Sequence, residues 1–177
     1  MIKQDIKLNT RELFYYANEL FYNNYNDEAI FYYNKFLIQN DKFIENAIQA
    51  KINLSKIYKK QNKLELAKQS LFESFLFDLP RSEALCELGH IYYENGDYKS
   101  AIYFYKLAIK KPNINSLAFI DIYCYNYIPN LQIALCYYYL KDYKNAVKFN
   151  KKAIKLNKNS KIALQNQIFY ENALKNK

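Results

Sequence analysis

The sequence predicts an all-α fold of stacked helical hairpins, and three observations lead to this prediction. Only 2 glycines and 3 prolines occur in 177 residues, so the tight turns of a many-stranded β protein lack their usual residues. Alanines stand at equivalent places in four segments, which indicates an internal repeat, at Ala29, Ala67, Ala101 and Ala146. Around these alanines, apolar residues lie three or four positions apart, as they do on one face of a helix.

The first two hairpins are expected over residues 10–41 and 48–80. Their helices are predicted at about 9–24 and 26–39, and at about 43–60 and 63–77. The repeat positions of the first hairpin are Tyr16, Ala17, Leu20, Ala29, Tyr33 and Phe36. Those of the second hairpin are Leu54, Ser55, Tyr58, Ala67, Leu71 and Ser74. In both sets small side chains alternate with large ones, which lets two helices approach closely.

The third hairpin, over residues 82–113, is the clearest copy, with helices at about 82–95 and 97–110. Its repeat positions are Leu85, Leu88, Gly89, Tyr92, Ala101, Tyr105 and Ala108. Leu85, Leu88 and Tyr92 share one helical face because they lie three or four residues apart. Between the two helices, Gly96 is suited to a positive φ and Asp97 to capping the second helix.

The fourth hairpin is expected over residues 127–158, with helices at about 128–140 and 142–156. Its repeat positions are Ile133, Ala134, Tyr137, Ala146, Asn150 and Ala153. An insertion at about 113–126 precedes it, where Pro112 and scattered Asn residues interrupt the helical period. A last helix at about 160–174 carries Gln165, Asn166, Gln167, Glu171 and Asn172, so we expect a terminal cap that faces water.

These repeat positions resemble the tetratricopeptide pattern, whose unit is a helical hairpin of about 34 residues, with Leu85 in place of its Trp. The resemblance implies a right-handed superhelix of about four hairpins plus the C-terminal capping helix. It also implies a single domain over residues 1–177, since no linker long enough to divide two domains is present.

Longer strings are similar to a more specific family. They are LNTRELFYYANELF, AKINLSKIY, LPRSEALCELGHIYYENGDYKSAIYFYKLAI and DIYCYNYIPNLQIALCYYYLKDYKNAVKFNKKAIKLN. They resemble the region that follows the catalytic domain in bacterial tetratricopeptide-containing family 2 glycosyltransferases, a group that includes enzymes acting on bacteriocin peptides. The resemblance implies subunit pairing or the holding of a substrate protein. It does not imply transferase activity in this polypeptide, because the metal-binding Asp-x-Asp of those enzymes is absent and Asp121 is followed by Ile122 and Tyr123.

The inventory of reactive residues predicts no enzyme, cofactor or metal site. Cys86, Cys124 and Cys136 form neither an even set nor a CxxC pair, so we expect reduced, packed thiols. The single histidine, His90, shares a helical stripe with Cys86 and Glu94, an arrangement that can activate a thiolate. A nucleophile on a helix lacks an oxyanion pocket, however, because the helix amides are already bonded, so we interpret this stripe as part of a binding wall.

The first helix of each hairpin is expected to line a concave surface, and every third or fourth residue points into it. These positions are Arg11, Phe14, Asn18, Phe21, Gln49, Ile52, Lys56, Lys59, Glu83, Cys86, His90, Tyr93, Ile128, Leu131, Leu135 and Tyr138. Several are large apolar groups where a free surface faces water, which favours a docking surface for a partner helix, an extended peptide or a second copy of the chain. The alternative is that curvature or the extra segment covers them.

Lysines give the chain a second candidate surface and most of its net charge of +9. Lys144, Lys148, Lys151, Lys152 and Lys155 recur at helical spacing. They are suited to docking on an acidic protein, nucleic acid or a membrane surface, or they form a solvated outer face, which we favour. Nucleic-acid recognition more often uses arginine, and the chain has only Arg11 and Arg81.

The sequence therefore predicts a non-catalytic scaffold that binds a protein or peptide, or pairs with itself as a homodimer, through the concave face. The alternative is the accessory substrate-binding or dimerisation region of a peptide or protein glycosyltransferase whose catalytic domain is elsewhere. Nucleic-acid binding through the lysines is the least favoured interpretation. No apolar run approaches about 18 residues and no signal peptide is recognisable, so we expect a cytoplasmic protein without membrane insertion.

Overall fold

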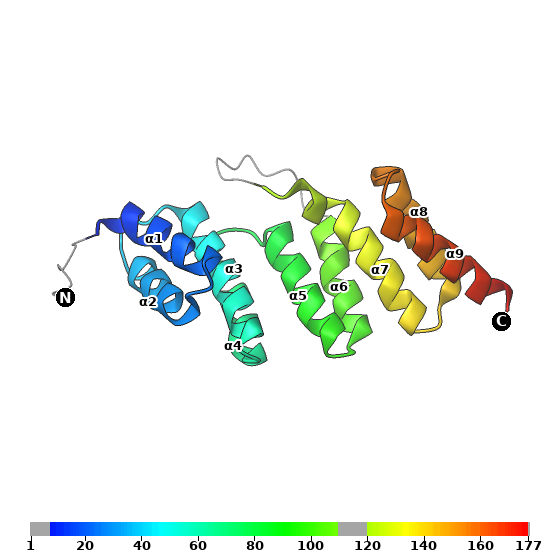
Figure 1. Cartoon of the computed structure of the whole chain (residues 1–177), viewed down its shortest axis with the longest axis horizontal. Coiled ribbons are helices and arrows are strands. Elements are labelled where there is room, and N and C mark those ends of the chain that lie inside the picture. Colours follow the sequence, from blue (N-terminus) through cyan, green and yellow to red (C-terminus); the bar gives the residue numbers. More distant parts are fainter. Residues whose placement is uncertain (1–7, 110–119, 177) are drawn as a thin grey trace. The chain divides into compact units, whose positions relative to one another are not determined.

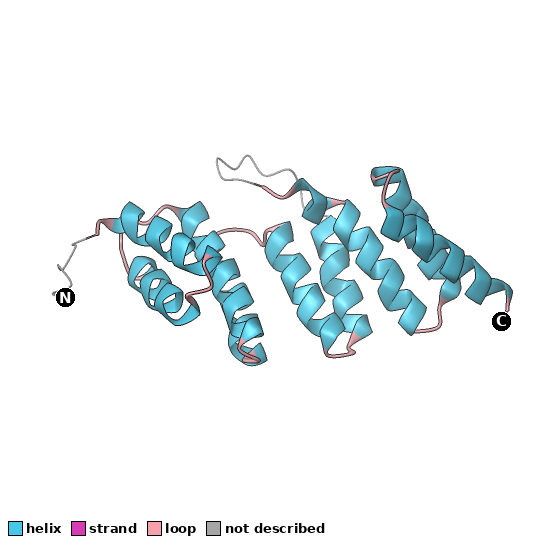
Figure 2. Cartoon of the chain, viewed as in Figure 1, coloured by secondary structure: helices cyan, strands magenta, loops and turns pink. Residues whose placement is uncertain are grey.

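The computed structural model describes residues 8–109 and 120–176 and is helical throughout this part (Figure 1). The described residues form nine α-helices and one short 3-10 helix and contain no strand (Figure 2). The all-α prediction is therefore confirmed. The chain divides into two compact units, Met1–Leu79 and Pro80–Lys177, and each is described by itself. The single domain over residues 1–177 stays a prediction.

The first unit contains two helical hairpins. Helix α1 (Thr10–Tyr22) pairs with α2 (Asn26–Leu37), and α3 (Ile44–Lys60) pairs with α4 (Leu64–Ser74), while α3 also packs against α1 and α2. Asn9 begins α1 through a capping box, in which its side chain accepts from the Glu12 amide and Glu12 Oε2 accepts from the Asn9 amide. Helix α4 ends at Ser74, three residues before the predicted end at 77.

A buried core holds the helices of the first unit together. Its fully buried members are small and large in alternation, as the repeat pattern predicts: Ala17, Ala29, Tyr33, Phe36, Ala47, Ala50 and Ile57. The alanines allow the helix backbones to approach, and the Tyr33 and Phe36 rings fill the remaining space. The apolar residues that recur at helical spacing in the sequence therefore pack together in one core.

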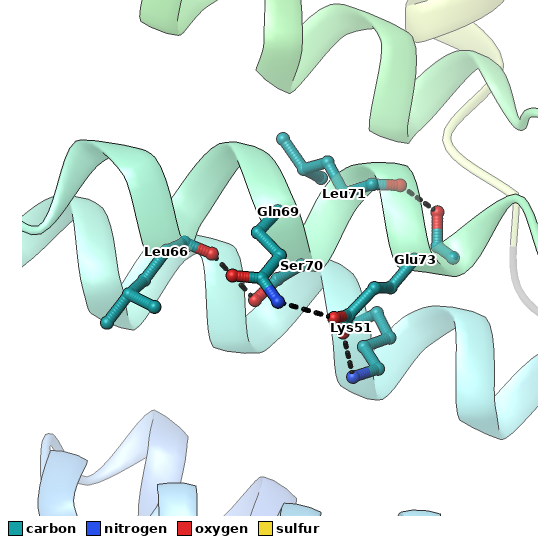
Figure 3. A network of polar contacts seen from close by, with 7 residues as sticks. Lys51, Leu66, Gln69, Ser70, Leu71 and Glu73 are labelled. Atoms are coloured by element: carbon teal, nitrogen blue, oxygen red, sulfur yellow. Dashed lines mark hydrogen bonds and ion pairs between the residues drawn. The ribbon is translucent and has the colours of Figure 1, made fainter.

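Polar contacts join α3 to α4 on the surface of this unit. Figure 3 shows Lys51 of α3 reaching the carboxylate of Glu73 on α4, which also accepts from Gln69 Nε2 at 2.8 Å. Hydrogen bonds to Glu73, first that from Lys51, hold the pKa of its carboxyl below the ordinary value. The Glu73 carboxylate therefore links α4 to α3 through its contact with Lys51.

The second unit contains two more hairpins and a last helix. Helix α5 (Ser82–Glu94) pairs with α6 (Tyr98–Ile109), and α7 (Tyr127–Tyr139) pairs with α8 (Tyr143–Leu156). Helix α6 packs on α7, and α9 (Lys161–Lys175) packs on α8. Of the expected insertion at 113–126, residues 113–119 lie outside the described residues. The rest forms the 3-10 helix η1 (Ile122–Tyr125), which contacts α5, α6 and α7.

All four hairpin turns use the same backbone motif although their sequences differ. One residue in each turn has a positive φ, namely Asn24 (61°), Asn62 (58°), Gly96 (75°) and Lys141 (61°). The amide of the following residue donates to the carbonyl five positions earlier at 2.9 Å in every turn, from Tyr25 to Leu20, Lys63 to Tyr58, Asp97 to Tyr92 and Asp142 to Tyr137. This is the Schellman motif, which satisfies the last carbonyls of the first helix.

The predicted cap helix α9 has a mixed outer side: Gln165 and Asn172 are exposed, as expected, whereas Gln167 is half-buried. Gln167 is turned toward α8, where its Oε1 accepts from Asn150 Nδ2 at 2.8 Å. Asn150 is fully buried and also donates to the Ala163 carbonyl at 2.8 Å. The exposed side of α9 carries Ile162, Ile168 and Phe169 beside the exposed Gln165 and Asn172. Gln167 lies on the inner side because the buried amide of Asn150 requires partners.

Candidate functional site

Two predicted concave-face residues of the first unit are buried. Phe14 is 5% exposed and its ring lies 5.3 Å from that of Phe36, inside the core. Ile52 is 2% exposed. Neither side chain is accessible, so neither belongs to an exposed docking surface. The spacing alone did not separate these positions from those at the surface.

Asn18, a third predicted position, is part of a buried polar network that links α1, α2 and α3. Its Oδ1 accepts from the Tyr33 hydroxyl at 2.7 Å and from Asn53 Nδ2 at 3.2 Å. Asn53 Nδ2 also donates to the Tyr33 hydroxyl at 2.8 Å, and Gln49 Nε2 donates to Asn53 Oδ1 at 2.9 Å. Burial raises the pKa of Tyr33, so the hydroxyl stays protonated. These contacts serve the fold of the first unit.

The other predicted positions of the first unit are exposed or half-buried. Arg11 is exposed and its guanidinium lies 5.5 Å from the Tyr15 ring. Phe21 is half-buried beneath the Lys60 ammonium, 5.7 Å away. Lys56 and Lys59 are half-buried on α3. Of these four described residues, only Phe21 is apolar, so a docking surface of large apolar groups in the first unit stays a prediction.

In the second unit, the segment around η1 covers the beginning of α5. Glu83 accepts from the Asp121 amide at 3.0 Å and from the Tyr125 hydroxyl at 3.3 Å. Cys86 is buried, and its thiol donates to the Cys124 carbonyl at 3.3 Å. A hydrogen bond with the Cys124 thiol, and then burial, raise the pKa of Cys86. At Glu83 and Cys86 the extra segment therefore occupies the surface that a partner was expected to use.

Further along α5 and α7 an aromatic surface remains, which we define as His90, Tyr93, Tyr98, Tyr138 and Tyr139. The rings lie against one another across three helices. Tyr98 and Tyr139 stack with centroids 5.1 Å apart and an interplanar angle of 9°. Tyr93 lies 5.8 Å from Tyr98, 6.0 Å from Tyr139 and 6.3 Å from His90. The Tyr138 and Tyr139 rings are 5.9 Å apart.

The aromatic surface combines accessible rings with a rigid base. Tyr139 is 48% exposed and the His90 side chain 40%, with His90 Nε2 at 3.2 Å from Glu94 Oε1. Beneath them Tyr105, Cys136 and Tyr170 are buried, and the Tyr170 ring lies 5.1 Å from that of Tyr138. Burial raises the pKa of the Cys136 thiol to about 12. The surface is therefore backed by neutral, closely packed groups, which hold its rings in place.

The remaining predicted positions, Leu131 and Leu135, are half-buried on α7, as is Ile128. Tyr98 and Tyr139 were not predicted. Tyr98 begins α6, the second helix of its hairpin, and Tyr139 is the last residue of α7, beyond the counted positions. The many tyrosines of the sequence gave no signal that would have selected these two. Only their packing on Tyr93 brings them to the same surface.

The predicted lysine stripe lies on the exposed side of α8. All five of its residues are exposed: Lys144, Lys148, Lys151, Lys152 and Lys155. Two of them have partners within the protein, since the Lys152 ammonium lies 4.6 Å from the Phe149 ring centre and Lys151 Nζ lies 3.4 Å from Glu171 Oε1. The location fits a solvated outer face, and binding of an acidic partner there stays a prediction.

Neither a metal-binding cluster nor a membrane-spanning helix is present in the described residues. In the ranges 8–109 and 120–176, no three His, Cys, Asp or Glu side chains are grouped closely enough to hold a metal ion. No helix in these ranges is long and apolar enough to cross a membrane.

Comparisons with known proteins identify the same repeat. The model of the SusR N-terminal TPR domain matches residues 6–115, and the tetratricopeptide repeat model matches residues 130–160. The crystal structure of MamA superimposes with a TM-score of 0.68 at 19% identity, covering 98% of this chain and 91% of that chain. A MamA mutant gives a TM-score of 0.64 at 13% identity, covering 93% of this chain and 87% of that chain.

No curated protein matches the chain. The two solved structures share its fold, as the predicted tetratricopeptide hairpins require. None of these matches names a glycosyltransferase, so the resemblance to that family's accessory region stays a prediction.

Proposed function

The chain belongs to the family of the SusR N-terminal TPR domain, and from this membership we propose that it is a non-catalytic docking scaffold that binds a protein through the aromatic surface of its second unit. The observation that carries the proposal is the contact between Tyr93, Tyr98 and Tyr139, which brings three rings from α5, α6 and α7 together at the protein surface.

Tyrosine is well suited to protein recognition. Its ring contributes a large apolar area with few rotatable bonds, and its hydroxyl hydrogen-bonds at the edge of an interface, so tyrosines are enriched among the residues that dominate binding energy. The rings of Tyr93, Tyr98 and Tyr139 already pack against one another, which restrains them before a partner arrives. A surface ordered in advance loses less conformational entropy on binding.

The position of η1 limits where the partner lies. Because Glu83 and Cys86 are covered by residues 121–125, the docking surface begins near His90 and extends toward Tyr138. Its polar edge is formed by His90 and Glu94, a pair suited to hydrogen bonds with a peptide backbone. An apolar or aromatic side chain of the partner packs against the tyrosines of the aromatic surface. An extended segment or a helix can present such a side chain.

Site-specific photocrosslinking tests this proposal. A photoreactive phenylalanine analogue placed at residue 139, in the aromatic surface, is compared with the same analogue at residue 103. Tyr103 is a matched control because it is also an exposed tyrosine, at 60%, on α6. In cells of the source organism, we expect a discrete crosslinked protein from position 139 and none from position 103.

The partner identified in this way is then tested with purified components. Tyr93→Ala combined with Tyr139→Ala should weaken its affinity at least about tenfold, as expected when dominant interface residues are truncated. Tyr103→Ala should leave the affinity unchanged. Equal crosslinking at both positions, or an affinity that the double variant does not alter, would refute the aromatic surface as the docking site.

A further inference from the structure

The outer face of α9 has the composition of an interface. Ile162, Ile168 and Phe169 are 61%, 63% and 66% exposed, and Leu164 and Leu174 add to the same helix at 46% and 42%. Within the described residues α9 packs mainly on α8, which leaves this face uncovered. The last helix of a repeat array ordinarily needs a polar outer face to remain soluble. The large apolar side chains exposed here, which flank the exposed Gln165 and Asn172, therefore point to a partner surface.

Charge restricts what can cover this face. Between residues 141 and 175 there are nine lysines and two acidic residues, Asp142 and Glu171. Lys161 and Lys175 lie at the two ends of α9 itself. Pairing of α9 with α9 of a second copy would bring these like charges together, which is unfavourable. The occupant must therefore be both apolar and acidic.

The first helix of the chain has this complementary character. Glu12, Tyr15, Glu19 and Tyr22 are spaced three or four residues apart, so they form one stripe of α1, and all four are exposed. Tyr15 is 50% exposed and Tyr22 70%. Residues 10–37 carry four acidic residues against two basic ones, Arg11 and Lys35. The first hairpin thus combines aromatic surface with negative charge.

We infer that the apolar face of α9 in one copy docks on the α1 stripe of a second copy. The two surfaces differ, so the contact is head-to-tail, and each pair leaves one α1 stripe and one α9 face free to bind further copies. Tyrosine rings on α1 cover the Ile and Phe side chains of α9, while Glu12 and Glu19 face its lysines. This inference uses neither His90 nor the tyrosines of the aromatic surface and is independent of the proposed function.

The test uses two variants of the full chain, each blocked at one surface. Ile168→Gln with Phe169→Gln removes the apolar face of α9, and Tyr15→Gln with Tyr22→Gln removes the rings of the α1 stripe. All four side chains are at least half exposed, so both variants should fold, which circular dichroism checks. Tyr103→Gln is the matched control at an exposed tyrosine elsewhere, 60% exposed.

Sedimentation velocity over a range of concentrations then distinguishes the arrangements. We expect the native chain and Tyr103→Gln to form dimers and larger species with rising concentration, and each blocked variant alone to stay monomeric. An equimolar mixture of the two blocked variants should form dimers that grow no further, because one intact α9 face meets one intact α1 stripe.

Three results would overturn the inference. A native chain that stays monomeric would show that another molecule covers α9. An α1 variant that still dimerises would show that α9 pairs with itself or with another surface. Two monomeric variants whose mixture stays monomeric would show that the surfaces do not bind each other. None of these results bears on crosslinking at residue 139, so the two proposals fail separately.

Discussion

Gly89 on α5 lies so close to the ring of Tyr105 on α6 that a β-carbon at residue 89 would come 2.8 Å from Cε1 of Tyr105. Both residues are buried. The two helices of the third hairpin can therefore approach this closely because residue 89 has no side chain. The sequence predicted a close approach of the two helices from the small residue at position 89, but not that the Tyr105 ring would be the group that it meets.

Gly89→Ala should destabilise the protein by about 1–3 kcal/mol, the typical cost of overpacking a core. Alanine favours a helix over glycine by up to about 1 kcal/mol, but the steric conflict with Tyr105 is larger. Urea unfolding measures the change. Adding Tyr105→Leu as a second substitution should reduce the cost of the alanine, because the ring that it meets is gone. A Gly89→Ala protein as stable as the native one would contradict the packing described above.

Lys141 should be replaceable by glycine with a gain in stability of about 0.5–1 kcal/mol. Its φ is 61°, a conformation that is strained for a residue with a β-carbon. The equivalent residue of the third hairpin is Gly96, with a φ of 75°. Thermal unfolding of Lys141→Gly measures the gain, and Lys141→Ala, which keeps the β-carbon, should show none. A loss of stability in Lys141→Gly would mean that contacts of the lysine outweigh the backbone strain.

Lys141 also shows which features of the fold could be predicted from the sequence and which could not. The repeat predicted eight paired helices and the last helix, because apolar periodicity and small residues depend only on the local helix. The four turns share one hydrogen-bond pattern, but only Gly96 was recognisable, since Lys at a positive φ is set by the helices on either side. The turn of Gln167 toward Asn150 was missed for a similar reason, because it depends on contact between two helices.

The candidate site was less predictable than the fold. Counting helix positions found His90, Tyr93 and Tyr138, but also selected Phe14 and Ile52, which are buried. Such counting assumes an identical environment in every repeat. That assumption fails where residues outside the repeat pattern intervene, as η1 does against α5.

Tyr33→Phe should destabilise the first unit by about 1–2 kcal/mol. Its hydroxyl donates to Asn18 and accepts from buried Asn53, so its removal leaves Asn53 Nδ2 with only the longer bond to Asn18, at 3.2 Å. Urea unfolding followed by circular dichroism gives the change in free energy. Tyr22→Phe is the matched control, because Tyr22 is 70% exposed and its loss should change stability by less than about 0.5 kcal/mol. Equal effects of the two substitutions would argue against the buried network.

Glu73→Gln should make the stability of the protein less dependent on acid pH. The pKa of Glu73 is lowered in the folded state, first by the hydrogen bond from Lys51. A lowered carboxyl pKa contributes stability above the unfolded value of about 4.3, and this contribution is lost as the pH falls through the lower folded value. The Glu73 side chain is 35% exposed, so solvent screening limits the effect to about 1 kcal/mol or less.

Urea midpoints of the native protein and Glu73→Gln should therefore differ at pH 7 and converge as the pH falls through the lowered pKa of Glu73. Glu65→Gln is the control on the same helix, since Glu65 pairs with Lys68 only across one turn and its side chain is 87% exposed. A difference between native and Glu73→Gln protein that persists unchanged at low pH would show that the carboxylate charge is not its source.

The three cysteines should react with a thiol reagent in a defined order. Cys124 is half-buried, whereas Cys86 and Cys136 are buried. Burial raises the pKa of Cys136 to about 12, and a hydrogen bond with Cys124 together with burial raises the pKa of Cys86. Because the thiolate is the reactive form, a raised pKa lowers its population at pH 8 and slows the reaction.

In the folded protein, we therefore expect one fast equivalent of Ellman's reagent to be consumed by Cys124 and the other two thiols to react only slowly. Cys124→Ser should remove the fast phase. Unfolding in guanidinium chloride should make all three thiols react at similar rates, which shows that the order comes from the fold. A fast reaction of Cys136 in the native state would contradict its burial beneath the aromatic surface and would mean that α7 opens readily from the helices packed on it.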